Sequence, residues 1–230
     1  MDERRSGMMH RIIDLSLPVE EFTASPPSQG ENTRFATVFR APGHWQATWL
    51  SLSAHTASHV DSPLHCLANQ IAIGQMSLDR VIGEALVLDV SHVHDMQPVG
   101  SDDFRHYESK VKEGDILLIR SGWSERKWGN SDYFTSSPYL SEQGARWLAD
   151  RKPKAVGFDF FQEYSAKTKD FSPEDFVIHR ILMESGIVVM EGLTNLGALG
   201  SKRVMFFGAP LKLIGPEASP ARFLALVESE

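Results

Sequence analysis

The sequence predicts an α/β protein, because strand-like and helix-like stretches alternate along its central part. Three apolar runs bounded by turn residues predict buried strands, at residues 84–90, 116–120 and 155–159. Between them, residues 101–112 and 141–150 each begin with a serine that can cap a helix. Alternation of this kind is typical of a layered α/β fold with some parallel pairing.

The N-terminal part is less regular. Residues 11–17 predict a short strand that ends at Pro18. Residues 20–43 carry clusters of proline, so we expect a long excursion with one strand at residues 34–39. A loop of this length is usually functional or contacts a neighbouring subunit. Residues 47–59 alternate in polarity and predict one continuous strand.

The C-terminal half adds a helix and a strand end with candidate polar residues. Residues 172–185 begin with Ser-Pro and two acids, a strong helix start, and His179 lies on this helix. The next strand, residues 187–190, ends at Glu191. Ligands in open α/β sheets bind at the carboxyl ends of strands, which places Glu191 well for chemistry. The ordinary alternatives are a loop acid for Glu191 and a histidine packed on the sheet for His179.

Composition narrows the class of protein. The 230 residues can form one large domain or two small ones, and 42% hydrophobic with 23% charged residues is ordinary for a soluble protein. The net charge of -7 argues against a nucleic-acid partner. No apolar run approaches the ~20 residues that span a bilayer, and the first residues do not resemble a secretory signal. We therefore expect a cytoplasmic protein without a membrane partner.

One eleven-residue stretch, residues 55–65, holds three of the nine histidines and a carboxylate. His55, His59, Asp61 and His65 all occupy odd positions, so an extended chain would point them to one face. Imidazole and carboxylate together make a first coordination shell for a divalent transition metal. The alternative is a structural polar cluster, which would leave several buried polar groups hard to satisfy.

This stretch resembles the hallmark His-x-Gly-Thr-His-x-Asp-x-Pro-x-His of the metal-dependent cyclase family, which includes bacterial kynurenine formamidase and isatin hydrolase. The likeness continues in segments over almost the whole chain, at residues 13–16, 114–118, 121–123, 156–159, 179–180, 191–196, 209–211 and 219–222. The chain departs from the family pattern in two places. Ala57 and Ser58 replace Gly-Thr, and residues 159–163 (DFFQE) replace an Asp-Thr-Pro-Ser-type run.

The resemblance implies a single domain, residues 1–230, with the swivelling β/β/α fold: a mixed sheet flanked by helices. It implies a homodimer or homotetramer, with residues 1–45 as an arm or loop region at a subunit interface. It also implies one or two divalent ions, Zn or Mn. Carried across by position, a first ion would bind His55, His59 and Asp61, and a second would bind His179, Glu191 and the bridging Asp61. His65 would be the general base.

The resemblance further implies a metal-dependent hydrolase that cleaves an amide or cyclic amide bond in an aryl formamide or an isatin-like substrate. A bound metal lowers the pKa of water from ~15.7 toward ~7, which supplies hydroxide at neutral pH. Candidate contacts for an aromatic or cyclic small molecule are Trp45, Trp49, Trp123, Phe160, Phe161 and Ser58. Core packing is the alternative for the aromatic residues. Other functions left open are a non-catalytic metal- or ligand-binding protein, a metal-dependent lyase or dehydratase, and a lactone hydrolase.

Overall fold

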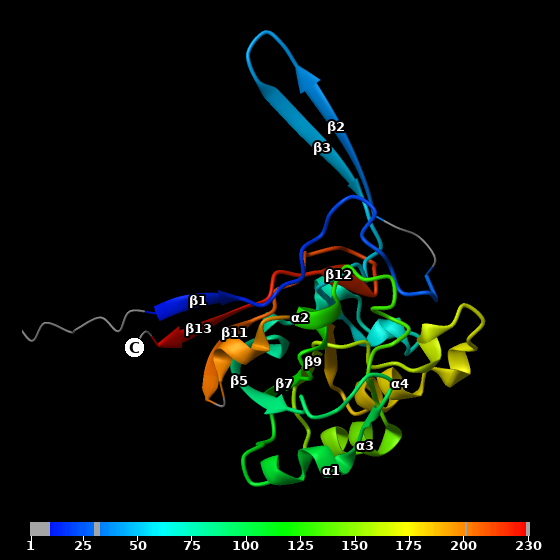
Figure 1. Cartoon of the computed structure of the whole chain (residues 1–230), viewed down its shortest axis with the longest axis vertical. Coiled ribbons are helices and arrows are strands. Elements are labelled where there is room, and N and C mark those ends of the chain that lie inside the picture. The colour runs from blue at the N-terminus through cyan, green and yellow to red at the C-terminus, as the bar shows by residue number, and fades with distance from the viewer. Residues whose placement is uncertain (1–9, 30–32, 201, 229–230) are drawn as a thin grey trace, which may run out of the picture.

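A nine-stranded sheet organises the chain in this computed structural model (Figure 1), which describes residues 10–29, 33–200 and 202–228. Part of the expected N-terminal arm, residues 1–9 and 30–32, lies outside the described residues. The strands of the sheet lie in the spatial order β1 (His10–Asp14), β13 (Leu224–Glu228), β11 (Arg203–Phe207), β5 (Ile82–Asp89), β7 (Ile116–Arg120), β9 (Ala155–Phe158), β10 (Val188–Glu191), β4 (His59–Asp61) and β12 (Ala218–Pro220).

The centre of the sheet is parallel and its flanks are antiparallel. The parallel strands are β5, β7, β9 and β10, whose apolar runs are buried on both faces. Leu117 and Ile119 of β7 pack into one core cluster, while Ile116 and Leu118 pack into a second cluster on the other face. The predicted α/β class with parallel pairing is therefore confirmed.

The helices that contribute to the first cluster include α1 (Ser101–Phe104), α3 (Glu142–Asp150) and α4 (Val177–Glu184). The second cluster includes side chains of β1, β11 and β13, so the flanking strands curl around it. The sheet is thus mixed and flanked by helices, as expected.

One predicted helix agrees with its expected range, and two others are shorter than expected. Ser141 caps α3 as predicted, because its hydroxyl accepts a hydrogen bond from the Gly144 N–H at 3.1 Å. The helix expected over residues 101–112 is wrong in length: it ends as a 3₁₀ turn at Tyr107, beyond which the sequence is mostly charged. The helix expected over residues 172–185 is also interrupted, since Phe176 leaves the helical conformation with ψ at 62°.

A hairpin of β2 (Arg34–Arg40) and β3 (Trp45–Ser51) projects from the body of the molecule (Figure 1). The prediction of one strand over residues 47–59 is therefore wrong. The chain turns after β3, with the Thr56 N–H donating to the Ser53 carbonyl at 3.1 Å, and the φ of +53° at Ala57 is incompatible with a strand.

Elements that were not predicted include α2 (Trp123–Lys127), the two-residue strands β6 (Pro98–Val99) and β8 (Tyr139–Leu140), and the strands β11, β12 and β13. In the described ranges, no helix combines the length and apolar character that crossing a membrane requires.

Strand β4 is the element that positions the histidine stretch. It lies between β10 and β12 and pairs antiparallel with both. Its register sets His59 opposite Glu191 on one side and Asp61 opposite Ala218 on the other. Residues far apart in the sequence therefore meet at β4.

Candidate metal centre

The structure brings the four polar residues of the 55–65 stretch together, although they do not share one strand. His59 and Asp61 project from one face of β4, as residues two apart on a strand must. His55 precedes the strand in a turn, and His65 ends the 3₁₀ helix Pro63–His65 that follows it. The ring centroids of His55 and His65 lie 4.4 Å apart.

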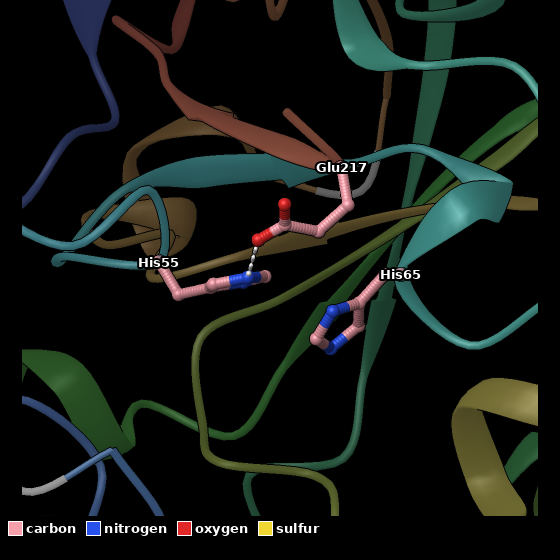
Figure 2. A group of neighbouring side chains, drawn as sticks. All are labelled: His55, His65 and Glu217. Carbon is pink, nitrogen blue, oxygen red and sulfur yellow. Dashed lines mark hydrogen bonds and ion pairs between the residues drawn. The ribbon is translucent and has the colours of Figure 1, made fainter. Parts of the chain in front are cut away.

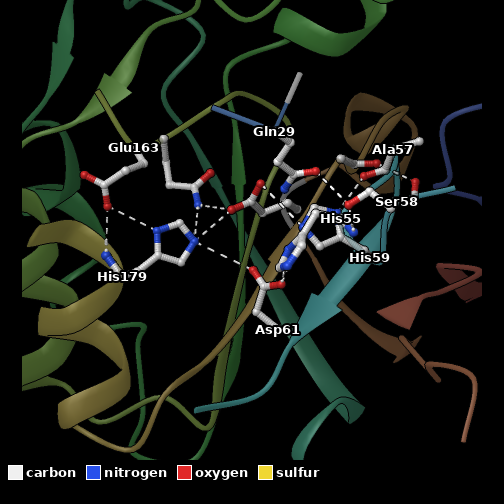
Figure 3. A network of polar contacts seen from close by, with 12 residues as sticks. Gln29, His55, Ala57, Ser58, His59, Asp61, Glu163 and His179 are labelled. Atoms are coloured by element: carbon white, nitrogen blue, oxygen red, sulfur yellow. Dashed lines mark hydrogen bonds and ion pairs between the residues drawn. The ribbon is translucent and has the colours of Figure 1, made fainter. Parts of the chain in front are cut away.

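Asp61 is the hub of this cluster and is fully buried. One of its carboxylate oxygens, Oδ1, lies 2.9 Å from Nδ1 of His55 and 3.5 Å from Nε2 of His59. Its other oxygen, Oδ2, lies 3.7 Å from Nε2 of His179. Asp61 therefore faces histidines on both sides, as Figure 3 shows.

The second half of the cluster comes from α4 and the end of β10. His179 is buried on α4, and its Nε2 lies 2.9 Å from Oε1 of Glu191. The other oxygen of Glu191 lies 3.7 Å from Nε2 of His59. All five residues expected to bind metal thus converge, from β4, the turn before it, α4 and β10.

Unpaired atoms in this cluster point to a cation. Within the described residues, Nε2 of His59 and both carboxylate oxygens of Asp61 are buried and form no hydrogen bond of regular geometry, although Oδ1 of Asp61 lies 2.9 Å from Nδ1 of His55. Donor atoms of His55, His59 and Asp61 lie within 4.8 Å of one another, as do those of Asp61, His65 and His179. Neutral imidazole and carboxylate at this spacing are a donor set suited to a divalent transition metal.

The electrostatics of the cluster lead to the same conclusion. Burial favours neutral histidine, but Asp61 and Glu217 outweigh it and raise the pKa of His55 to about 10. Burial alone would raise the pKa of Asp61, yet His59 and His55 hold it well below its usual range. The buried carboxylates therefore favour positive charge at His55, a charge that a divalent cation could supply instead.

His65 has a different environment. Burial lowers its pKa to about 4, so its ring is neutral near pH 7. The ring lies at the wall of a cavity, with centroids 5.2 Å from Phe176 and 5.4 Å from His179. A neutral imidazole in this place has a free lone pair for a proton, and its lowered pKa makes it a weaker base than an exposed histidine.

The sequence analysis did not identify three polar residues that belong to the site. The side-chain amide of Gln162 donates to Oε1 of Glu191 at 2.6 Å. Glu163 accepts hydrogen bonds from both the backbone N–H and Nδ1 of His179, each at 3.1 Å. Glu217 contacts Nε2 of His55 at 3.0 Å. The departure from the family pattern at residues 159–163 was the available signal for the first two, whereas nothing in the sequence pointed to Glu217.

The cavity beside the cluster has a volume of about 460 Å³. Its wall combines apolar side chains with the site histidines, and includes Leu64, Phe161, Phe171, Phe176, His65 and His179. Of the aromatic residues expected at a substrate, Phe161 lines this cavity, and Phe160 lines only a smaller adjoining hollow.

The three tryptophans that were expected at a substrate do not line this cavity. Trp123 is fully buried in the core, where its indole N–H donates to the Tyr133 carbonyl at 2.9 Å. Trp45 and Trp49 are exposed on the projecting hairpin. Ser58 is also buried, and its hydroxyl bonds to backbone rather than facing the cavity.

Fold and site together define an α/β protein with a buried centre of histidines and carboxylates beside an apolar cavity. The chain belongs to the family described as "Putative cyclase", whose model matches residues 13–162.

Two relatives show how widely the likeness extends. The chain is 27% identical to the kynurenine formamidase of Salinibacter ruber over 213 residues, which cover 92% of this chain and 95% of that protein. It is 23% identical to the isatin hydrolase of Roseibium aggregatum over 195 residues, which cover 78% of this chain and 74% of that protein. Both names support a hydrolase at the level of the family.

Solved structures confirm the fold. An isatin hydrolase bound to the product analogue thioisatinate superposes with a TM-score of 0.82 at 20% identity, covering 97% of this chain and 94% of that one. A protein described as a predicted metal-dependent hydrolase from Bacillus stearothermophilus has a TM-score of 0.75 at 25% identity, covering 95% and 98%. The expected cyclase fold is therefore confirmed.

Proposed function

We propose that this protein is a metal-dependent hydrolase that cleaves an amide or cyclic amide bond in a small aromatic or cyclic substrate. The observation that carries the proposal is the convergence of His55, His59, Asp61, His179 and Glu191, with unpaired buried donor atoms, at the wall of an apolar cavity. The names of the relatives, a formamidase and an isatin hydrolase, support the type of bond.

The charge of the site supports two divalent ions rather than one. Asp61, Glu163 and Glu191 are three buried carboxylates, and Glu217 adds a fourth that is partly exposed. One divalent ion would leave net negative charge in a buried site, which is costly, whereas two would balance it. Imidazole and carboxylate donors are compatible with zinc or manganese.

The metal donors, His65 and the aromatic side chains would have different roles in hydrolysis. The divalent cations that the five donor residues would hold would supply Lewis acidity, which polarises the scissile carbonyl group and acidifies water. His65, neutral and beside the donors, accepts the proton of the attacking water and returns it to the leaving nitrogen. Phe161, Phe171 and Phe176 exclude water and hold the aromatic part of the substrate.

The proposal is tested by elemental analysis and a hydrolysis screen. Purified protein should contain at least about one equivalent of zinc or manganese, and added metal should raise its melting temperature. Metal-loaded protein should hydrolyse an aryl formamide or isatin faster than a lactone of matched size. Absence of metal binding would overturn the site, and turnover of lactones alone would overturn the amide assignment.

We also propose that the chain forms a homodimer or homotetramer through the hairpin of β2 and β3. Both faces of the hairpin carry exposed apolar side chains, which include Phe39, Trp45, Trp49 and Leu50. A two-stranded hairpin is marginally stable alone in water, and exposed apolar patches usually mark an interface. The hairpin has two arginines and no acid, whereas the rest of the chain is acidic, so charge also favours a second copy as the partner. A single domain in the cytoplasm remains our expectation.

A further inference from the structure

The three histidines among the proposed ligands share one arrangement. Each has one ring nitrogen facing the cluster and the other nitrogen against a fixed acceptor. Nδ1 of His59 donates to the Ala57 carbonyl at 2.9 Å, and Nδ1 of His179 meets Glu163 at 3.1 Å. His55 is reversed: Nδ1 faces Asp61 at 2.9 Å, and Nε2 meets Glu217 at 3.0 Å (Figure 2).

The reversal matters because His55 must be neutral to bind a metal, and the neutral ring has two possible acceptors, Asp61 and Glu217, for its one remaining proton. A neutral imidazole carries its proton on either Nδ1 or Nε2, and only the nitrogen without the proton can bind a metal. With the proton on Nδ1, His55 would donate to Asp61 and present no lone pair to the cluster. Glu217 offers the competing acceptor, which holds the proton on Nε2 and leaves Nδ1 free.

Backbone pairing fixes Glu217 in this place. It immediately precedes β12, and its carbonyl accepts a hydrogen bond from the Ser62 N–H at 2.8 Å, next to the β4 register. The pairing therefore brings a carboxylate to His55 across 162 residues of sequence. The side chain of Glu217 is 38% exposed, so it lies at the edge of the cluster rather than inside it.

We propose that Glu217 is a positioning residue that selects the metal-binding tautomer of His55. Carboxylates that accept the second N–H of a ligating histidine fix its ring and raise its basicity, and losing such a partner costs typically ~10- to 100-fold in metal affinity. The inference rests on the proposed metal site. It does not follow from that site, because the five ligands are present without Glu217.

A direct role in metal binding is the competing explanation. Donor atoms of His55, His65 and Glu217 lie within 4.8 Å of one another and form a third group that could hold an ion. If Glu217 were a ligand there, its loss would remove one bound ion. If it positions His55, its loss would weaken binding without changing the number of ions.

The test is a zinc titration against a chromophoric chelator, with the wild type, Glu217→Gln and Glu217→Ala. Glu113→Gln is the matched control, since it removes the same charge from an exposed turn. We expect unchanged stoichiometry, with affinity ~10- to 100-fold lower in Glu217→Ala and a smaller loss in Glu217→Gln, whose amide oxygen still accepts. Long-range ¹H–¹⁵N NMR of His55 in the zinc-loaded wild type should show the proton on Nε2.

The outcomes separate the two proposals. If the wild type binds no zinc, the proposed function itself fails. If the wild type binds zinc and Glu217→Ala binds it with equal affinity, the positioning role is wrong while the function stands. A lower stoichiometry in Glu217→Ala, or a proton on Nδ1 of His55, would also overturn it. If metal-free Glu217→Ala melts at a lower temperature than the metal-free wild type but binds zinc with the same affinity, the contact is merely structural and the positioning role is wrong.

Discussion

The hydroxyl of Ser58 donates a hydrogen bond to the carbonyl oxygen of Gly192 at 2.6 Å, although 134 residues separate them in the sequence. The same hydroxyl oxygen accepts the N–H of Leu17 at 2.8 Å. Ser58 therefore ties the histidine stretch to the strand end that carries Glu191 and to the N-terminal segment. Its place is structural, next to His59, one of the proposed ligands.

Replacing Ser58 with alanine should therefore lower the free energy of unfolding. The change leaves a buried carbonyl and a buried N–H without their partner, which costs about 1 to 3 kcal/mol. Urea unfolding of the metal-free protein measures the effect. Ser58→Thr is the control, because it keeps the hydroxyl and should lose much less. An unchanged Ser58→Ala would show that water replaces the side chain.

Replacing Ala57 with glycine should stabilise the protein. Ala57 has a φ of +53°, a left-handed conformation that costs a residue with a Cβ roughly 1 kcal/mol or more. Part of this gain is offset because glycine is more flexible in the unfolded chain, so we expect a net increase of roughly 0.5 kcal/mol. Thermal and urea unfolding measure it. A clear loss of stability would mean that the Ala57 methyl group packs favourably.

Replacing His65 with alanine should abolish most turnover and leave the metal content intact. Removal of a general base typically lowers the rate ~10²- to 10⁴-fold. The kcat on the substrate found in the screen and the metal content by elemental analysis are the two measurements. His94→Ala is the control, since His94 is exposed and does not line the cavity. Loss of metal from His65→Ala would make His65 a ligand instead of a base.

Because of Lys167, the free energy of unfolding should increase as the pH rises from about 8 to about 10. It is only 8% exposed, its ammonium group donates to the Ser137 carbonyl, and burial lowers its pKa to about 8. An unfolded lysine keeps its proton to about pH 10.4. Between these values the unfolded chain binds more protons, so the folded state gains stability as pH rises.

The measurement is the difference in unfolding free energy between the wild type and Lys167→Met. That difference should move in favour of the wild type by about 2 kcal/mol between pH 8 and pH 10. The subtraction removes the contribution of other titrating groups. Parallel pH profiles for the two proteins would contradict the prediction.

Replacing Trp49 with aspartate should dissociate the proposed oligomer. Trp49 is 76% exposed on the hairpin, and a charge there would be buried if a second copy covered it. Sedimentation velocity at several concentrations gives the mass. Ile214→Asp is the matched control, as Ile214 is 79% exposed but lies outside the hairpin. A monomeric wild type, or an oligomer that resists Trp49→Asp, would count against the hairpin interface.

The sequence predicted the α/β class and the grouping of the site residues, but for the histidine stretch the reason was wrong. Period-2 spacing explains only His59 and Asp61, which share β4. His55 and His65 join them from a turn and a 3₁₀ helix, because Ala57 bends the chain and Pro63 starts a helical turn. The residue spacing therefore predicted that these side chains meet, but it did not predict the backbone conformation that brings them together.

Residues that depend on strand pairing were beyond the reach of local patterns. Glu217 precedes a three-residue strand, too short for any periodicity, and meets His55 only through the register of β12 on β4. Strands β11 and β13 were missed as well, since they are defined by the curled flank of the sheet. The position of Glu191 could be predicted, because the end of its strand is recognisable in the sequence and ligands bind at the carboxyl ends of strands in such sheets.

The position of β4 between β10 and β12 also has a consequence for the order of events in folding. The hydrogen bonds just before it, from Ser58 to Gly192 and from His55 to Glu217, join residues separated by 134 and 162 positions. Contacts of such long range close late. A cation that needs donors from all these segments can recognise only the finished sheet. Its binding should therefore slow unfolding and leave the folding rate almost unchanged. The chain would fold first and bind its metal afterwards. The bound metal would then keep the folded protein from unfolding quickly.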